Sequence, residues 1–456
     1  MTDIRTKIFA LAAILLSWPC EGFARDIYVR LANAASYTVG ITQGMLTMTD
    51  ADGRLVNLGD EANISVNDNN AVIMGNVFPL PVRFSGAGLL QFKGRNYRGA
   101  FLITQRGGLL NVLDIEQYLC GVLPAEVGAN WHTQALRAQA ICARTYALKQ
   151  SMRRAEKGYD VVDTDADQVY KGASVETAKT NQAVSATAGQ VLTYGKELAF
   201  TYFHSDSGGH TANISDVWGQ NLPYLTGVPE VVNYKSPVSV WNAKISASTV
   251  QNAVKKVTGT DIGTVTAIQV SEVDEGGRAN KITIIGTNGS QTIKASQFRT
   301  AVSPRAIKST MLTPSGGAFN VNNTTTPSGL VSTQKSNRPL SPGLTFEEEQ
   351  GIAKMTSEGV FTTIELIDML TNPGKKKEYY QTGVSRAGKP KVQQPKIAKY
   401  GYTIEKSGSD FIFYGRGWGH GVGLCQWGAM AMADNGYSAE KILAHYYPGT
   451  AVKKIK

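Results

Sequence analysis

The chain has 456 residues, of which 42% are hydrophobic and 18% are charged. This composition excludes an intrinsically disordered chain, and at roughly 100–200 residues per domain the length allows two to four units. Lys and Arg number 46 against 36 Asp and Glu, and only five His and four Cys are present. These counts exclude a Cys-rich scaffold and most multi-metal enzymes.

The first 24 residues are typical of a signal peptide. Arg5 and Lys7 precede the apolar run 8–16, and Gly22 and Ala24 offer small side chains at the two positions that a signal peptidase reads. That run is too short to span a bilayer, which needs about 20 apolar residues. The residues before Cys20 are too bulky for a lipoprotein signal, so we expect cleavage rather than lipidation. No later stretch predicts a membrane helix, and we expect a secreted or periplasmic, cell-wall-associated protein.

Hydrophobic periodicity predicts an α+β fold made mostly of antiparallel strands. Strand-like alternation occurs in residues 26–60, in further runs to Val112, in residues 176–203, and in a meander over 262–293 that turns at Gly276-Gly277. Helices are predicted over residues 131–152, 247–258 and 439–446. The first is the clearest because it is rich in Ala, and Ser438 is a suitable N-cap for the last.

An insertion or linker is predicted over residues 301–399, because its first part is rich in Pro, Ser, Thr, Asn and Gly. Two short helices are predicted within residues 345–369. Residues 375–399 hold eight Lys and Arg against Glu378 alone, a charge of +7. This stretch suits an anionic cell-wall or membrane surface, and a solvated linker explains it equally well. The predicted units are the signal segment 1–24, a first domain part 25–300, the insertion 301–399 and a second domain part 400–456.

Cleavage of the signal segment leaves three cysteines, Cys120, Cys142 and Cys425. An odd number in an exported protein leaves at least one thiol unpaired or bound to a metal. The sequence does not choose a disulfide among them. We expect small buried residues that pack as hydrophobes.

The first stretch that could carry chemistry contains Glu126. We expect this Glu on a loop that Pro124 stiffens, among apolar neighbours, where a carboxyl group has a raised pKa and holds a proton near neutral pH. A general acid needs that property. The alternative is that Glu126 caps or salt-bridges the helix that follows. The polar groups of that mostly apolar helix are Arg137, Gln139, Arg144 and Tyr146.

The second stretch places His204 and His210 on either side of a Gly-Gly turn. The two His could be zinc ligands, but a structural zinc site wants four ligands. A hydrogen-bonding role in a substrate cleft requires fewer residues to come together than a zinc site does. Four of the five His lie in or next to the stretches described here, which predicts one assembled site.

The third stretch, residues 415–429, alternates Gly with other residues. Such Gly residues let the backbone approach a ligand or another strand closely. The stretch is neither a phosphate loop nor a dinucleotide-binding motif. A purely structural β-bend explains the Gly residues but not His420 and Gln426. Trp418 and Trp427 offer flat faces for sugar rings or for the core.

Together these stretches resemble the SpoIID/LytB domain family, named for the stage II sporulation protein D and the amidase enhancer. The resemblance covers roughly residues 26–300 and 400–455. Departures are mild: Arg137 stands where Lys is common, Val127 where Met is common, and Trp427 where Tyr is frequent. The matching motifs are Leu123–Glu126, Leu136–Ala140 with Ala143–Ala147, Ser207–Thr211 with Val217-Trp218, Gly417–Gly423 with Gln426, Gly428 and Ala429, and Tyr446–Thr450.

The resemblance implies a lytic transglycosylase of peptidoglycan that prefers glycan strands without stem peptides, with Glu126 as the catalytic acid and base and the Ala-rich helix beside the cleft. It implies sporulation as the setting, glycan strands as the partner, an amidase as a second candidate partner, and no nucleic acid. Some members bind zinc through Cys and His. No Cys accompanies His204 and His210, so no metal or cofactor is assigned, and zinc stays the open alternative. Substrate-binding roles are expected for Arg137, Gln139, Arg144, Tyr146, His204, His210, His420 and Gln426.

A lytic transglycosylase suits a site with one carboxyl group. Ordinary glycosidases use two. In the transglycosylase reaction the 6-hydroxyl of N-acetylmuramic acid attacks its own anomeric carbon and forms a 1,6-anhydro ring, so one Glu can act first as acid and then as base. A second hypothesis is a non-catalytic, wall-binding enhancer of an N-acetylmuramoyl-L-alanine amidase. A hydrolase is a third.

Overall fold

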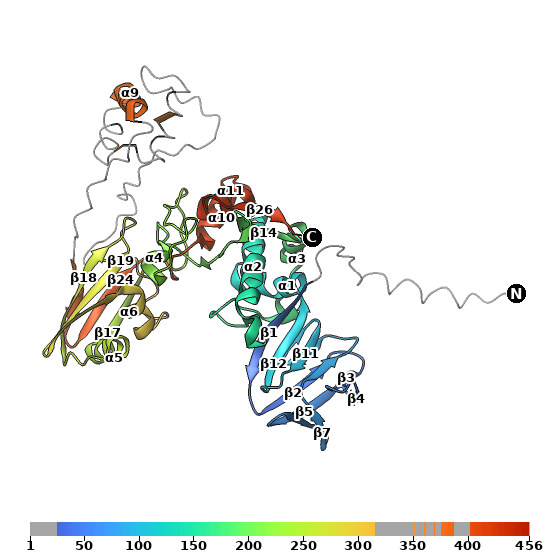
Figure 1. Cartoon of the computed structure of the whole chain (residues 1–456). Coiled ribbons are helices and arrows are strands. Elements are labelled where there is room, and N and C mark those ends of the chain that lie inside the picture. The colour runs from blue at the N-terminus through green and yellow to red at the C-terminus, as the bar shows by residue number, and fades with distance from the viewer. Residues whose placement is uncertain are drawn as a thin grey trace.

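The computed structural model describes residues 25–314, 375–386 and 402–455, and also residues 348, 351, 352, 355, 360, 361 and 369. The predicted signal segment lies outside the described residues, as do most of residues 345–369. In Figure 1 an N-terminal unit of strands leads into a central group of helices, and a second α+β unit lies on the other side of those helices.

The N-terminal unit consists of two sheets with a shared hydrophobic core. One sheet has the order β13-β1-β12-β11-β8-β3-β4 and the other the order β10-β9-β2-β5-β6-β7. Alternate residues of each strand point into the core, as in β5, where Ala62 and Ile64 are buried. The strands are β1 (Asp26–Asn33), β2 (Ser36–Ile41), β3 (Leu46–Thr49), β4 (Leu55–Gly59), β5 (Glu61–Asn67), β6 (Asn70–Ile73), β7 (Asn76–Pro79), β8 (Val82–Ser85), β9 (Leu90–Phe92), β10 (Arg95–Tyr97), β11 (Ala100–Ile103), β12 (Gly108–Asp114) and β13 (Val161–Val162).

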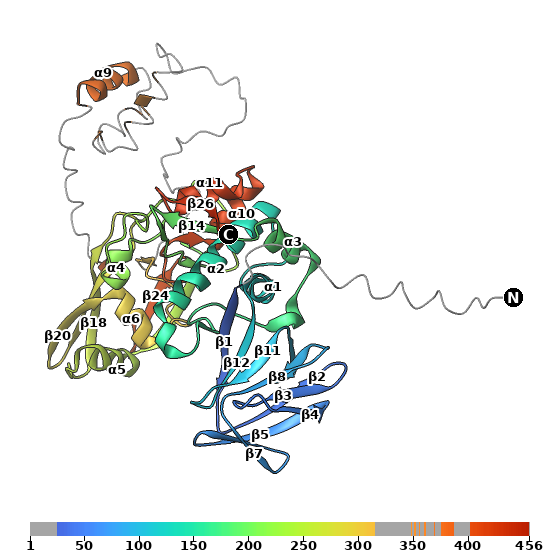
Figure 2. The ribbon, with the colours of Figure 1, turned by 45° about the vertical axis from the view of Figure 1, so that its right-hand side comes forward.

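The central helices pack around α2, most of whose residues are buried. Figures 1 and 2 show α10 and α11 at one end of α2 and the strands β1 and β12 at the other. The small Ala side chains let these neighbours approach α2 closely. The elements are α1 (Ile115–Glu126), α2 (Thr133–Arg153), η2 (Ala155–Lys157), η3 (Gly172–Val175), α3 (Ala178–Ala186), β14 (Gln190–Tyr194), β15 (Glu197–Leu198), β16 (Phe203–His204), α4 (Ile214–Trp218), β25 (Leu424–Cys425), α10 (Gln426–Asp434), α11 (Ala439–Tyr446) and β26 (Ala451–Lys454).

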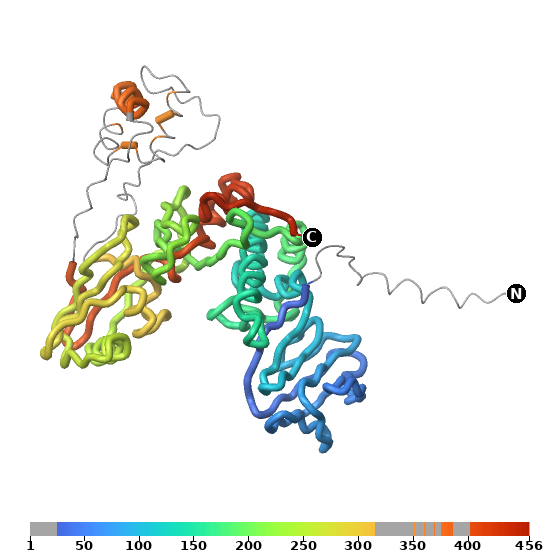
Figure 3. Tube along the Cα trace, viewed as in Figure 1, coloured from blue at the N-terminus to red at the C-terminus, as the bar shows by residue number. Residues whose placement is uncertain are grey.

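The second α+β unit has its own hydrophobic core. Its sheets have the orders β17-β24-β21 and β20-β19-β18-β22, and β23 also pairs with β24. The trace in Figure 3 shows the chain passing from β24 in this unit back to the helices beside α2. The elements are β17 (Trp241–Ser246), α5 (Ala247–Thr258), β18 (Val265–Val273), β19 (Ala279–Gly286), β20 (Gly289–Lys294), α6 (Ala295–Val302), β21 (Leu312–Thr313), β22 (Tyr402–Thr403), β23 (Glu405–Ser407) and β24 (Asp410–Gly415); α9 (Lys376–Arg386) lies within the predicted insertion.

The predicted α+β fold class is confirmed, and most strand pairs are antiparallel. The predicted helix at 247–258 coincides with α5, and the one at 439–446 with α11. Ser438 is the N-cap of α11, since its Oγ accepts from the Lys441 N–H at 3.4 Å. The three cysteines among the described residues are free, Cys142 and Cys425 are buried and Cys120 is half-buried, as expected for residues that pack as hydrophobes.

Two predictions of local structure are wrong. Residues 123–126 form the last turn of α1 rather than a loop, although Pro124 removes one backbone hydrogen bond. The helix persists because Tyr118, Leu119 and Val122 bury its apolar face and Asp114 caps its start.

The second error concerns residues 176–203, which contain α3 as well as strands. Thr177 caps α3 by accepting from the Thr180 N–H at 3.3 Å, and Ala183 and Val184 are buried. Across the described ranges, no helix combines the length and the apolar character needed to cross a bilayer.

Candidate active site

Glu126 lies half-buried at the C-terminal end of α1. Its Oε1 accepts a hydrogen bond from the Val169 N–H at 2.5 Å. Burial raises the pKa of Glu126 from 4.5 to about 7, and the nearby negative charge of Asp165 acts in the same direction. The Val169 N–H and the Gln426 amide oppose this rise in the pKa because they favour the charged form. The carboxyl group can therefore hold a proton near neutral pH.

Glu126 does not take the structural role that the sequence leaves open. Among the described residues it forms no ion pair with any of the three Arg of α2, Arg137, Arg144 and Arg153. The bond from Val169 instead ties it to the loop that precedes η3. A carboxyl group that is half-buried and unpaired is available for chemistry.

The loop around Val169 is anchored to both α1 and α2. Asp167 accepts from the Tyr146 hydroxyl at 2.8 Å and forms an ion pair with Arg154. Gln168 accepts from the Tyr118 hydroxyl at 3.1 Å and donates to the Ala143 carbonyl at 3.4 Å. These bonds fix the Val169 N–H opposite Glu126. Tyr146, a predicted substrate-binding residue, thus supports the loop in this structure.

Two predicted binding residues, Gln139 and Gln426, bury amide atoms without hydrogen-bond partners. The side chain of Gln139 has no hydrogen bond at either its oxygen or its nitrogen within the described part of the chain. The Nε2 of Gln426 is also buried without one, although this amide lies near enough to Glu126 to affect its pKa. An unsatisfied buried polar atom costs roughly 1–3 kcal/mol. Such atoms beside a titratable carboxyl group are typical of a site that a polar ligand completes.

The Gly-rich stretch holds Gln426 in place by packing against another segment of backbone. Asp206 and Trp418 exchange backbone hydrogen bonds of 3.0 and 2.8 Å, and β16 pairs in parallel with β25 just before Gln426. Gly423 has a φ of 71°, and a Cβ there would lie 2.1 Å from the Tyr202 carbonyl oxygen. Of the two roles open for these Gly residues, the structure shows close approach to another strand.

Of the four His residues that the sequence groups together, the structure shows two, His204 and His420, with their rings side by side. The rings of His204 and His420 lie 5.5 Å apart. His132 caps α2 instead, and His445 binds the Pro229 carbonyl at 3.0 Å. The imidazole groups of His132 and His445 thus serve as a helix cap and as a partner of a backbone carbonyl.

The His204–His420 pair is held uncharged. Burial lowers the pKa of His420 to about 3 and lowers that of His204 well below its ordinary value. The His420 Nδ1 accepts from the Val422 N–H at 3.0 Å, and the His204 Nδ1 faces the Val422 carbonyl at 3.2 Å. The Nε2 of His204 is buried without a partner among the described residues. Both rings are therefore neutral hydrogen-bonding groups at neutral pH.

The Nδ1 atoms of the two predicted zinc ligands face different carbonyls, that of His210 facing the Thr211 carbonyl at 2.7 Å and that of His204 facing the Val422 carbonyl. Over the residues that the structure describes, no group of three or more His, Cys, Asp and Glu could hold a metal ion.

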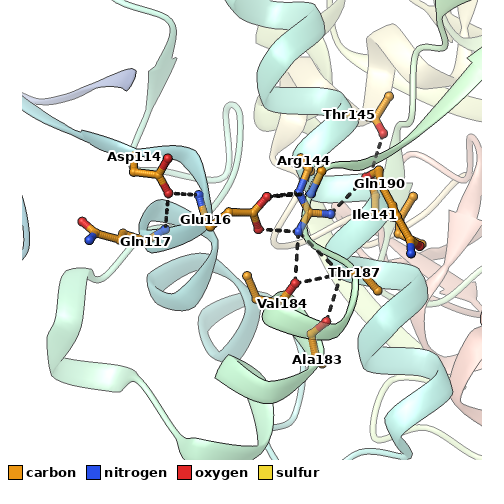
Figure 4. A network of polar contacts seen from close by, with 11 residues as sticks. Asp114, Glu116, Gln117, Ile141, Arg144, Thr145, Ala183, Val184, Thr187 and Gln190 are labelled. Carbon is orange, nitrogen blue, oxygen red and sulfur yellow. Dashed lines mark hydrogen bonds and ion pairs between the residues drawn. The ribbon is translucent and has the colours of Figure 1, made fainter. Parts of the chain in front are cut away.

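Arg144 is a structural residue. The structure therefore corrects the prediction that it binds substrate. Its side chain is fully buried and forms a two-bond ion pair with Glu116, at 2.7 and 2.5 Å (Figure 4). It also donates to the Gln190 carbonyl at 3.0 Å. This network joins α1, α2 and β14, and it leaves no donor for a substrate. Arg137 is half-buried, with an Nε that has no hydrogen bond in the described ranges.

Aromatic rings that the sequence motifs do not mark lie along α2. The Tyr146 ring is 6.2 Å from Tyr202 and 6.4 Å from Phe203. Tyr202 stacks on Phe200 and contacts Trp218, which is 43% exposed. The alternation of apolar and polar residues over 198–204 indicates that some of these side chains are buried. It does not indicate that they pack against α2.

A second buried network of polar residues was also not predicted from the sequence. Glu230 accepts from the Ser207 and Tyr446 hydroxyls, each at 2.6 Å, and burial raises its pKa. Arg278 is buried and donates to backbone carbonyls, including that of His210 at 3.0 Å. These residues brace the Gly-Gly turn. They lie far apart in sequence, so no local pattern marks them.

Two cavities lie away from Glu126. One of about 490 Å³ is lined by residues of the N-terminal sheets such as Tyr37, Gln91 and Lys93. The other, of about 440 Å³, is lined among others by Arg30 and Tyr159. Neither includes the candidate acid.

Comparison with known proteins points to one family. Residues 104–194 match the SpoIID family model, described as stage II sporulation protein. This match covers the end of the N-terminal unit, α1, α2 and α3, and so includes Glu126.

Three relatives extend the match. An uncharacterized protein of Brachyspira hyodysenteriae is 27% identical over 75% of this chain and 68% of its own length. The amidase enhancer of Bacillus subtilis is 27% identical over 73% of this chain and 40% of its own length. The stage II sporulation protein D of Bacillus subtilis is 36% identical over 27% of this chain and 41% of its own length. The match to each of the two Bacillus proteins thus spans about two fifths of that protein.

Proposed function

We propose that this chain, which belongs to the SpoIID family, is a lytic transglycosylase that cleaves the glycan strands of peptidoglycan. The observation that carries the proposal is the carboxyl group of Glu126. It is half-buried, forms no ion pair among the described residues and has a pKa of about 7. The amide of Gln139 and the Nε2 of Gln426, which have no hydrogen-bond partner among the described residues, supply polar groups for a substrate.

In the proposed reaction Glu126 acts twice. Its proton passes to the glycosidic oxygen as the bond from that oxygen to the anomeric carbon of N-acetylmuramic acid breaks. The 6-hydroxyl oxygen of the same sugar then bonds to the anomeric carbon, and its proton returns to the Glu126 carboxylate. The Val169 N–H, 2.5 Å from Oε1, stabilises the carboxylate between the two transfers. Attack from within the substrate gains a high effective concentration.

The relatives support a role in the cell wall. The names stage II sporulation protein D and amidase enhancer belong to Bacillus proteins that this chain resembles. We infer that the chain acts outside the cytoplasmic membrane, on the wall. The denuded strand, free of stem peptides, is the proposed substrate.

The test replaces Glu126 with Gln. Purified glycan strands without stem peptides are incubated with each protein, and the products are identified by mass spectrometry. The wild type should release 1,6-anhydro ends, which are one water lighter than hydrolysed ends, and Glu126→Gln should lose at least about 100-fold of this rate. Release at the wild-type rate by the variant would reject Glu126 as the acid.

Asp165→Asn is the matched control. Asp165 is an exposed carboxylate close enough to raise the pKa of Glu126. A mechanism with one carboxyl group predicts that Asp165→Asn still releases anhydro ends. A hydrolase with two carboxyl groups predicts that this variant loses activity and that the wild type makes reducing ends.

A non-catalytic enhancer of an amidase is the second candidate. It is favoured by the match to the amidase enhancer over 73% of this chain. This function predicts that wild type and Glu126→Gln accelerate peptide removal by an added amidase equally. It also predicts that neither protein releases anhydro ends.

A further inference from the structure

One face of α2 carries polar side chains at intervals of seven residues. Gln139, Tyr146 and Arg153 lie on this face, because seven residues are close to two helical turns. At a rise of 1.5 Å per residue, neighbours in the row are about 10 Å apart along the helix. The row ends at the C-terminus of α2 with Arg153.

The middle of this row contacts the loop that holds the candidate acid. The Tyr146 hydroxyl donates to Asp167, and the same loop supplies the Val169 N–H that binds Glu126. Arg153 lies seven residues further along α2, which Figure 2 shows in the middle of the molecule.

Arg153 is a cation without an acidic partner. It is exposed, forms no ion pair among the described residues, and hydrogen-bonds only to uncharged side chains there, Gln150 at 3.5 Å and the Tyr202 hydroxyl. Lys149 lies nearby but is paired with Glu197 at 3.5 Å. Arg153 alone of these two cations thus has its charge free for a ligand.

Arg153 also borders a group of partly exposed aromatic rings. Its guanidinium lies 5.5 Å from the centre of the Phe200 ring. Phe200 stacks on Tyr202 with centres 5.8 Å apart and 5° between the planes, and Tyr202 lies 4.7 Å from Trp218. Exposed aromatic rings next to a planar cation are a common surface for binding a ring that carries a carboxylate.

We propose that Arg153 with Phe200, Tyr202 and Trp218 forms a second glycan subsite, remote from Glu126, that binds the lactyl carboxylate of a muramic acid residue. The aromatic rings pack on the sugar, and the guanidinium binds the carboxylate through two parallel hydrogen bonds. This inference rests on the proposed function, because it takes a glycan strand as the ligand. The lactyl group is a free carboxylate only where the stem peptide has been removed, so this subsite would select denuded strands.

The experiment measures binding separately from cleavage. All variants carry Glu126→Gln, and affinity is measured by calorimetry for two glycan samples of equal length. One is denuded glycan with free lactyl carboxylates, and the other is the same glycan with those groups converted to primary amides. Arg153→Gln should weaken binding of the carboxylate glycan about tenfold and leave binding of the amide glycan unchanged. Trp218→Ala should weaken binding of both.

Lys157→Gln is the matched control. Lys157 is an exposed cation in η2, and its replacement removes the same charge at a place away from the aromatic rings. The affinity of this variant for each glycan should equal that of the Glu126→Gln protein without a further change. Equal weakening by Lys157→Gln and Arg153→Gln would overturn the subsite, because it would indicate general charge attraction. An unchanged affinity of Arg153→Gln, or equal weakening for both glycans, would overturn it as well.

The two proposals fail in different ways. If the wild type releases no anhydro ends but the Arg153→Gln substitution weakens binding of the carboxylate glycan alone, the subsite stands and the transglycosylase does not. If anhydro ends are released and the Arg153→Gln substitution changes the affinity for both glycans equally or for neither, the subsite is wrong and the reaction stands. Thermal unfolding of each variant establishes that these surface changes leave the fold intact.

Discussion

A carboxyl group must carry its proton to serve as an acid, and burial keeps Glu126 protonated. With a pKa of about 7, its protonated fraction falls as the pH rises above 7. We therefore expect the rate of anhydro-end release to fall about tenfold per pH unit above that value. Rates on denuded glycan between pH 5 and 9 provide the measurement. A rate that is constant from pH 6 to 9 would contradict the role of Glu126 as acid.

The same shift in pKa has a consequence for stability. The folded pKa lies above the ordinary value of 4.5, so the contribution of Glu126 is complete below pH 4.5 and is lost as the pH rises through 7. Glu126→Gln cannot ionise. We expect its Tm to equal that of the wild type at pH 4 and to exceed it by about 2–6 °C at pH 8. A Tm difference that is the same at both pH values would contradict this expectation, because it would show that ionisation of Glu126 does not destabilise the folded protein.

Residues differ in how far their roles follow from sequence. Glu126 could be predicted because its apolar neighbours are also its neighbours in the chain. Arg144 could not, because its partner Glu116 lies 28 positions earlier on another helix. Periodicity placed Arg137 and Arg144 on a common face of α2 and did not show which of them is buried. Arg153 carries no motif signal, because its setting depends on rings from residues 200–218.

At the scale of elements, the segment from β24 to α10 depends on Gly423. Its φ of 71° disfavours other residues, and a Cβ would lie 2.1 Å from the Tyr202 carbonyl oxygen. We expect Gly423→Ala to lower the free energy of unfolding by at least about 3 kcal/mol. Gly436→Ala is the control. Its φ is 83°, but no atom lies within 4 Å of the added Cβ, so only about 1–2 kcal/mol should be lost. Urea denaturation of both variants tests the contrast, which equal losses would contradict.

Elements with strong local signals could be predicted from sequence. The helices α5 and α11 begin at Ser caps and have one apolar face, and both match the prediction. The helix α3 was missed because Ala and Val at its buried positions also suit a strand. The Gly-rich stretch predicted close approach of the backbone, but its partner, residues 202–208, is distant in sequence.

At the scale of the whole molecule, the second α+β unit is built from two distant parts of the chain. β21 pairs with β24 through Leu312 and Gly415, and β22 pairs with β18 through Tyr402 and Val270. Both ends of the segment between residues 314 and 402 are therefore held by strands of one unit. After β24 the chain enters the Gly-rich stretch and reaches Gln426 at the start of α10. The second unit thus has a direct connection to the candidate site.

This arrangement predicts that residues 316–400 can be replaced by a Gly/Ser linker of about 15 residues, which can span about 50 Å. The anchoring strands stay in the chain, and the cost of closing a loop depends only weakly on its length. We expect the Tm to stay within about 2 °C of the wild type and the release of anhydro ends to be unchanged. A chain with the same linker added after residue 315 and nothing removed is the control. If that control is active while the shortened chain unfolds or loses cleavage, residues 316–400, which make up most of the predicted insertion 301–399, are part of the catalytic unit. The first residues of that prediction, 301–313, already belong to the second unit, because they include the end of α6 and β21.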